Sequence, residues 1–283
     1  MKLIAFTRNG RRSIGIVQGD GVVDIGLRKP EWTTLVDVLR HDGLWELRSI
    51  AQSTADYRLA DVGLLKPIER PDKILCVGVN YRDRPGEYHD GADPPRYPSL
   101  FVRFPGSLVP HGAALIRPRE SLQLDYEGEL AIVIGRAGRR IAAAQARDFI
   151  AGFTVANDGS VRDWIRHGKF NVTPGKNFER SGSLGPWLVT ADDVPDEPLR
   201  VQTTVNGDLR QDATTDQMLF PIPQLIAYIS SFCELLPGDL ILTGTPTGAG
   251  ARFDPPRYLV PGDRVEVSVS HVGTLANTVA ADE

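Results

Sequence analysis

Three acidic side chains open an otherwise apolar stretch of the sequence, QLDYEGELAIVIG. They are Asp125, Glu127 and Glu129, each two residues from the next. Alternate side chains of an extended chain point to the same face, so these carboxylates crowd the edge of an apolar surface. Like charges raise one another's pKa, and burial of an unpaired carboxylate costs on the order of several kcal/mol or more. The cluster therefore requires a counter-charge, which a bound cation would supply.

A third acid is available at the end of another apolar run, GFTVAND. Its last residue, Asp158, is expected near the same site because ligands are usually met at strand ends. Glu127, Glu129 and Asp158, completed by waters, would form an all-oxygen site that suits Mg²⁺, Mn²⁺ or Ca²⁺ better than Zn²⁺. Asp125 is expected just outside this ligand set. A solvated strand edge is the alternative that spacing alone leaves open.

The elements that must position these acids fall into two units. Strand-like alternation over residues 1–27, with turns at RNGRR and QGDGV, predicts a small sheet of hairpins. Residues 31–52 then show helical spacing, with Gly43 as a break between two short helices. Pro67 and Pro71 mark a linker. We therefore predict a small N-terminal α/β domain over residues 1–70 and a larger catalytic domain over residues 71–283.

The larger unit combines many short strands with few helices. Strand-like apolar runs recur at KILCVGVNY, LAIVIG, GFTVAND, WLVT, RVQTTVNG, LILTGTP and RVEVSVSHVGTL. Helical spacing is visible over residues 142–152 and 222–239. The frequent punctuation by 28 Gly and 21 Pro also suits short strands better than long helices. The fold class expected from these patterns is rich in sheet.

Bulk composition excludes several classes of function. With 32 basic and 36 acidic residues the net charge is −4, so the chain lacks the basic field that a nucleic-acid partner requires. No segment approaches the roughly 20 apolar residues that span a bilayer, and we expect a cytosolic protein without a membrane partner. The two cysteines, Cys76 and Cys233, form no CxxC pair, which argues against a thiolate metal site.

Seven ordered motifs carry a resemblance to a known family. They are VGVNYRD, DYEGELAIVIG, FTVANDGSVRDW, GKNFE, LGPWLVT, VNG and LLPGDLILTGTPTGAG. Between residue 73 and about residue 279 the chain resembles the fumarylacetoacetate hydrolase family. The resemblance implies an α+β, mainly β, fold with a long curled mixed sheet (a β-roll), a small extra N-terminal domain and a homodimer. It also implies a divalent metal held by three carboxylates, which map onto Glu127, Glu129 and Asp158.

The resemblance further implies a substrate class. Family members act on small 2-oxo acids that chelate the metal and pass through a pyruvate-type enolate. Lys176 in PGKNF matches the family lysine whose ammonium would stabilise that charge, although a surface lysine is the plain alternative. Gly244 and Thr245 in TGTP match the segment that meets the substrate carboxylate, unless they form only a tight turn. Arg162 is a weaker substrate-side candidate, for which a structural salt bridge is the alternative.

One segment departs from the family pattern. Hydrolytic members carry NYxDHxxE, whose His and Glu activate water, whereas this chain reads NYRDRPGE, with Arg84 in place of the histidine and Glu87 retained. A guanidinium stays protonated and cannot act as a base near neutral pH. Glu87 alone could serve as the base, or His89 could replace the missing partner. Arg84 could instead bind a second substrate carboxylate. Further departures are Ile165, Asn177 and Glu179.

Three functions remain open on this basis. The first is a metal-dependent hydrolase that cleaves a C–C bond in an acylpyruvate or diketo acid. The second is an isomerase or decarboxylase of a 2-oxo-diene or oxaloacetate-like acid, which the loss of the histidine favours. The third is a non-catalytic binding protein on the same fold, against which the triad, Lys176 and Thr245 count. A serine hydrolase, a P-loop protein and a dinucleotide-binding protein are disfavoured because their glycine-rich motifs do not occur.

Overall fold

The N-terminal part of the chain forms a small sheet capped by short helices. The computed structural model describes residues 1–83, 95–168 and 171–282. The first hairpin turns through Asn9 and Gly10, which both have positive φ, as the sequence RNG favours. The predicted hairpins and the two helices separated by Gly43 are confirmed. The elements of this unit are β1 (Lys2–Arg8), β2 (Arg11–Gln18), β3 (Gly21–Asp24), α1 (Ile25–Arg28), α2 (Leu35–Arg40), α3 (Leu44–Ile50), β4 (Tyr57–Arg58), η1 (Leu59–Asp61) and β5 (Gly63–Leu64).

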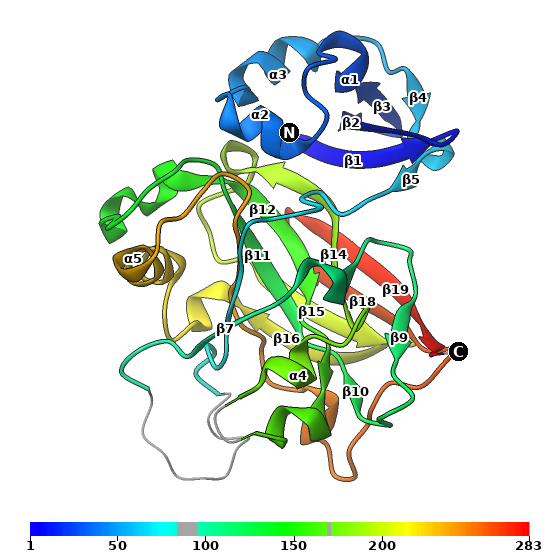
Figure 1. Ribbon diagram of the computed structural model, residues 1–283, viewed down its shortest axis with the longest axis vertical. Helices are drawn as coiled ribbons and strands as arrows, with labels where there is room; N and C mark the ends of the chain where they lie inside the picture. The colour runs from blue at the N-terminus through cyan, green and yellow to red at the C-terminus, as the bar shows by residue number, and fades with distance from the viewer. Residues whose placement is uncertain (84–94, 169–170, 283) are drawn as a thin grey trace.

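The larger sheet runs from this unit through the centre of the molecule in the order β4-β3-β2-β1-β14-β12-β11-β17-β6-β7 (Figure 1). β1 pairs antiparallel with β14, with Leu3 opposite Leu188, so hydrogen bonds cross the division predicted near residue 70. That division stays a prediction. The central strands are β6 (Ile74–Val77), β7 (Leu100–Val102), β8 (Leu108–Val109), β11 (Gly128–Ile134), β12 (Ile150–Asn157), β14 (Gly182–Thr190) and β17 (Leu240–Leu242).

A second sheet, ordered β16-β15-β18-β19-β9, packs against one face of β11. Leu130 and Ile132 belong to the core beneath this sheet, whereas Ala131 and Val133 belong to the core shared with the N-terminal unit. The sheets approach closely at Gly128, where a Cβ would lie 2.1 Å from Thr203 Oγ1. Its strands are β9 (Leu115–Arg117), β15 (Arg200–Val205), β16 (Asp208–Thr214), β18 (Arg264–Val269) and β19 (Gly273–Ala281).

Shorter elements complete the fold. The pair β10 (Leu124–Asp125) and β13 (Ser160–Val161) lies beside the start of β11, and α5 (Ile222–Phe232) confirms the helix predicted there. The helix expected over residues 142–152 is wrong in part, because β12 already begins at Ile150 and leaves only a 3-10 turn before it. The remaining elements are α4 (Thr173–Lys176), η3 (Pro105–Ser107), η4 (Ala143–Phe149), η5 (Arg162–Arg166), η6 (Ala191–Asp193), η7 (Thr215–Gln217) and η8 (Gly250–Arg252).

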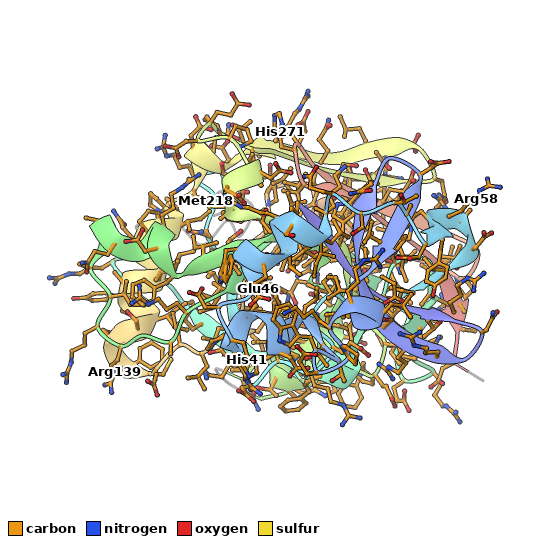
Figure 2. The ribbon with its side chains drawn as sticks, turned by 90° about the horizontal axis from the view of Figure 1, so that it is seen from above. His41, Glu46, Arg58, Arg139, Met218 and His271 are labelled. Atoms are coloured by element: carbon orange, nitrogen blue, oxygen red, sulfur yellow. The ribbon has the colours of Figure 1, made fainter. Side chains whose placement is uncertain are left out.

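The architecture is α+β and mainly β, as expected. Long charged side chains such as Arg58 and Arg139 project outward from the periphery (Figure 2). Within the described part of the chain, every helix is too short or too polar to cross a bilayer. What matters for function is the meeting of strand ends in the larger sheet, where the start of β11 lies against the end of β12.

Candidate metal centre and active site

The acids predicted as ligands come together where β11 begins and β12 ends. Gly128 pairs with Asn157, and the Asp158 N–H donates to Glu127 O over 2.8 Å, so the two strand ends share one edge. Glu127, Glu129 and Asp158 are buried, and each presents a carboxylate oxygen within 4.8 Å of the others. Among the described residues, these acids therefore form a buried cluster. The alternative interpretation, a solvated strand edge, is wrong.

Lys176 brings a buried ammonium to this cluster from α4. Its Nζ donates to Glu127 Oε2 and to Asp158 Oδ2, each over 2.6 Å. Burial alone would lower the pKa of Lys176, but the Asp158 and Glu127 carboxylates hold it above its ordinary value. The group is thus a permanently charged donor at neutral pH. It is not the surface lysine that composition alone suggested.

Arg103, which sequence reasoning did not single out, is a second buried cation at the site. Its side chain is fully buried, and Nη1 donates to Asp158 Oδ1 over 2.7 Å and to Gly159 O over 2.8 Å. The other guanidinium nitrogens donate to Ser107 and Ser181. The available signal was a lone arginine within the apolar run LFVRF, where burial requires a partner. That signal identifies a buried charge without indicating which acid it meets.

Arg162 forms the salt bridge that was the alternative to a substrate-side role. Its Nε donates to Asp125 Oδ2 and its Nη2 donates to Glu127 Oε1, each over 2.7 Å. Asp125 lies outside the triad, as expected, and also accepts from the backbone N–H groups of Gly250 and Ala251. Asp125 thus connects the loop that follows the TGTP turn to Arg162, whose guanidinium orients Glu127. A substrate-side role for Arg162 stays a prediction.

Among the described residues, Glu129 has fewer positively charged partners than the other two acids. Its Oε2 accepts the backbone N–H of Gly244 over 2.7 Å. Burial and the Asp158 and Glu127 charges raise the pKa of Glu129. Gly244 has φ of +98°, and a Cβ there would lie 2.7 Å from Asn80 Cβ, so the turn that delivers this N–H requires glycine.

The Thr245 hydroxyl already has protein partners. It donates to Gly128 O over 3.0 Å and accepts from Gln211 Nε2 over 2.8 Å. Gln211 Oε1 in turn accepts from Gly128 N, so the three groups lock the TGTP turn onto the start of β11. These contacts assign Thr245 a structural task. The contacts of Gly244 and Thr245 with a substrate carboxylate stay a prediction.

The donor set fits a divalent cation. Within the described part of the chain, the cluster contains the carboxylates of Asp125, Glu127, Glu129 and Asp158 against the cations Arg103, Arg162 and Lys176, which leaves one net negative charge when all are ionised. Three buried carboxylate oxygens in close proximity suit hard cations that prefer oxygen ligands. The residues present therefore match the metal that the fold implies.

Asp125→Asn is expected to lower the free energy of unfolding by about 3 kcal/mol, because it breaks a buried ion pair and leaves N–H donors without an acceptor. Asp125 is fully buried and accepts from Arg162 and from Gly250 and Ala251. Urea denaturation of the metal-free protein measures the effect. The control is Asp20→Asn, at an exposed turn. Equal stability of the two variants would contradict this account of Asp125.

The predicted water-activating residues lie elsewhere. Arg84, Glu87 and His89 fall outside the described residues, so their roles stay predictions.

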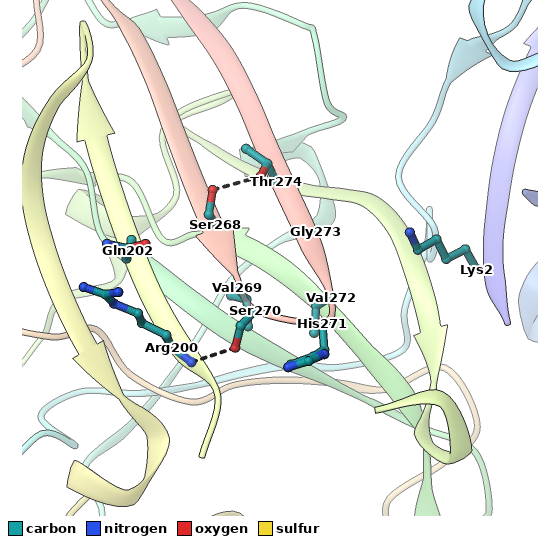
Figure 3. Close-up of a pocket in the computed structure, with 10 residues that line it drawn as sticks. All are labelled: Lys2, Arg200, Gln202, Ser268, Val269, Ser270, His271, Val272, Gly273 and Thr274. Atoms are coloured by element: carbon teal, nitrogen blue, oxygen red, sulfur yellow. Dashed lines mark hydrogen bonds between the residues drawn. The ribbon is translucent and has the colours of Figure 1, made fainter. Parts of the chain in front are cut away.

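A separate surface pocket lies at the edge of the second sheet, around the β18–β19 hairpin (Figure 3). Its polar lining residues have protein partners, since Arg200 pairs with Asp212, the His271 ring contacts Glu197 and the Lys2 ammonium lies over the Trp187 ring. The Ser268 and Thr274 hydroxyls bond to one another, and Ser270 accepts from the Arg200 backbone N–H. None of its lining residues belongs to the triad, and we place no chemistry there.

The chain is similar to known proteins in both sequence and structure. Residues 73–280 match the family described as Fumarylacetoacetate (FAA) hydrolase C-terminal. Oxaloacetate tautomerase YisK of Bacillus subtilis (strain 168) is 41% identical over 228 residues, which cover 79% of this chain and 75% of that protein. The mitochondrial oxaloacetate tautomerase Fahd2a of Rattus norvegicus is 40% identical over 268 residues, covering 92% and 84%. The structure of maleylpyruvate hydrolase from Sphingobium sp. SYK-6, in complex with manganese (II) ion and pyruvate, is 30% identical with a TM-score of 0.83 and covers all of both chains. The chain therefore belongs to the fumarylacetoacetate hydrolase family.

Proposed function

We propose that the protein is a divalent-metal-dependent tautomerase of a 2-oxo dicarboxylic acid of the oxaloacetate type. The observation that carries the proposal is the buried Lys176 ammonium, held 2.6 Å from both Glu127 and Asp158 at an all-carboxylate cation site. Support also comes from the two tautomerases that are 40–41% identical to the chain. They favour the isomerase hypothesis at least as strongly as the hydrolase hypothesis.

Tautomerisation transfers a proton between the carbon beside the 2-oxo group and the 2-oxo oxygen, so negative charge develops on that oxygen. A divalent cation on Glu127, Glu129 and Asp158 would supply Lewis-acid stabilisation of this charge. Lys176 adds a fixed positive charge and a hydrogen-bond donor next to the same carboxylates. Because these groups are preorganised and buried, they would not need to reorient as charge develops.

The base that removes the carbon-bound proton has to be another residue. The pKa of Lys176 is held above its ordinary value, so Lys176 stays protonated and cannot accept a proton. Glu87 in the NYRDRPGE segment is the candidate that the sequence offers. Arg84, three residues earlier, would bind the second carboxylate of a dicarboxylic acid, because guanidinium pairs with carboxylate in bidentate fashion.

A hydrolase of acylpyruvates is the second candidate. The similarity to maleylpyruvate hydrolase favours it, since both chains share the whole fold. Hydrolysis would additionally require a residue that activates water, and Arg84 stands where hydrolytic members have a histidine. The same groups around the cation would serve both reactions.

The test is a comparison of two substrates with the Mn²⁺-loaded protein. The enol form of oxaloacetate is followed by the loss of its ultraviolet absorbance, with pyruvate measured in parallel; an acylpyruvate is assayed for pyruvate release. We expect faster enol-to-keto conversion without pyruvate formation, and loss of this acceleration in chelator. Pyruvate release from the acylpyruvate, with no effect on the enol, would support the hydrolase and refute the tautomerase. Pyruvate formed from oxaloacetate faster than with Mn²⁺ alone would instead indicate a decarboxylase.

A further inference from the structure

Each carboxylate of the triad has one oxygen bound by an arginine or by a backbone N–H. Glu127 Oε1 accepts from Arg162 Nη2, Glu129 Oε2 accepts from the Gly244 N–H, and Asp158 Oδ1 accepts from Arg103 Nη1. All three contacts are 2.7 Å long. Three different parts of the chain supply the donors, namely η5, the TGTP turn and the end of β7. Each ligand thus has one oxygen held by a donor from a different part of the chain.

The donors are themselves fixed. Arg103 has a fully buried side chain with further bonds to Gly159 O and to Ser107 and Ser181. Arg162 is anchored by its Nε bond to Asp125. The Gly244 N–H belongs to the backbone and cannot rotate away without breaking the turn. Moving any of these donors off its carboxylate would therefore leave a buried charge or polar group unpaired, which is costly.

Two of the second oxygens converge. Glu127 Oε2 and Asp158 Oδ2 both lie 2.6 Å from Lys176 Nζ. An ionised carboxylate has about four lone-pair sites, so these oxygens can accept from Lys176 and still coordinate a cation. The Lys176 ammonium ends a flexible stem and can move aside for a cation. A carboxylate that coordinates through both oxygens would in addition have to share the oxygen held by a fixed arginine or backbone N–H, which cannot move aside.

We propose that Arg103, together with Arg162 and the Gly244 N–H, restricts the triad to one oxygen per carboxylate and so selects Mg²⁺ or Mn²⁺ over Ca²⁺. Small cations take six ligands at short, nearly octahedral positions, whereas Ca²⁺ takes six to eight and readily accepts bidentate carboxylates. Three single oxygens satisfy half of an octahedron. Arg103 is then a positioning residue that acts on the cation through Asp158. The inference rests on the proposed metal-dependent function.

Calorimetric titration with Mn²⁺, Mg²⁺ and Ca²⁺, without substrate, tests the proposal. The wild-type protein is expected to bind Mn²⁺ and Mg²⁺ more tightly than Ca²⁺. Arg103→Met frees Asp158 Oδ1 and is expected to raise the affinity for Ca²⁺ relative to Mn²⁺ at least about tenfold. Arg162→Met, at a side chain that is 12% exposed, removes the arginine donor from Glu127 Oε1 and should shift the ratio in the same direction even if Arg103→Met does not fold. Arg166→Met, an exposed arginine on the same 3-10 turn, is the matched control and should leave the ratio unchanged.

Two results would overturn the proposal: equal Ca²⁺ and Mn²⁺ affinity in the wild type, or an unchanged ratio in the folded arginine variants. A crystal structure of the Mn²⁺ complex gives an independent reading, since it should show one oxygen from each carboxylate, and bidentate ligation would refute the restriction. Failure of the proposed function looks different. If the wild type binds no divalent cation, metal dependence and this inference both fall; if selectivity shifts as expected but oxaloacetate is not tautomerised, only the reaction is wrong.

Discussion

Glu129→Gln is expected to weaken Mn²⁺ binding at least about 100-fold and to reduce turnover by a similar factor, because it removes a charged ligand. The same change should not lower the free energy of unfolding of the metal-free protein. Within the part of the chain that the structure describes, Glu129 accepts from a backbone N–H and forms no ion pair, and burial with the neighbouring Asp158 and Glu127 charges raises its pKa. A neutral amide removes that repulsion, while its oxygen can still accept the Gly244 N–H.

The other two ligands should behave differently. Glu127→Gln and Asp158→Asn are each expected to weaken the metal to a similar extent, but they also remove the partners of Arg162, Arg103 and Lys176. Unpaired buried cations are destabilising, so these two variants should lose stability where Glu129→Gln does not. Titration calorimetry and urea denaturation measure both effects, with exposed Glu120→Gln as the control. Unchanged affinity in all three variants would remove the triad from the cation site.

The triad was predictable because its geometry follows from strand alternation. Alternation places Glu127 and Glu129 on the same face of the strand as Ala131 and Val133. The structure confirms the alternation, since Ala131 and Val133 belong to one core and Leu130 and Ile132 to the core on the opposite face. Asp158 required only that β12 end where β11 begins. Lys176 and the TGTP turn, in contrast, could be linked to the site only through the family resemblance, because neither has a periodicity that aims it at the acids.

Arg103 shows what sequence alone could not supply. Its contacts reach Asp158, Ser107 and Ser181, and the separation in sequence from Asp158 is 55 residues. No local pattern encodes such a pairing, which depends on how the residue after β7, the end of β12 and the start of β14 are brought together. The 3-10 turn at Ala143–Phe149 was predicted as a longer helix for a similar reason. Its length is limited by β12, which begins at Ile150 because of pairing with strands distant in sequence. The homodimer implied by the resemblance stays a prediction.

Lys176→Met is expected to lower turnover at least about 100-fold while leaving Mn²⁺ affinity unchanged or higher. The loss corresponds to roughly 3 kcal/mol, as is typical when a donor aimed at developing negative charge is removed. The ammonium lies 2.6 Å from Glu127 and from Asp158. Its loss makes the cluster more negative by one charge, which favours a divalent cation. The substitution also removes the positive charge that would stabilise the developing negative charge on the 2-oxo oxygen. Binding of oxalate, a mimic of the enolate, should therefore weaken.

Stability separates this role from a purely structural one. Without Lys176, Glu127 and Asp158 lose their shared ammonium, so the metal-free variant should melt at a lower temperature than the wild type, and saturating Mn²⁺ should restore most of the difference. Lys29→Met, which breaks an ion pair with Glu46 in the N-terminal unit, is the control and should leave turnover unchanged. If Lys176→Met kept full turnover and oxalate affinity while its melting temperature fell, the lysine would only neutralise two buried acids. Charge stabilisation would then rest on the cation alone, and the catalytic part of the proposed function would have to be reassigned.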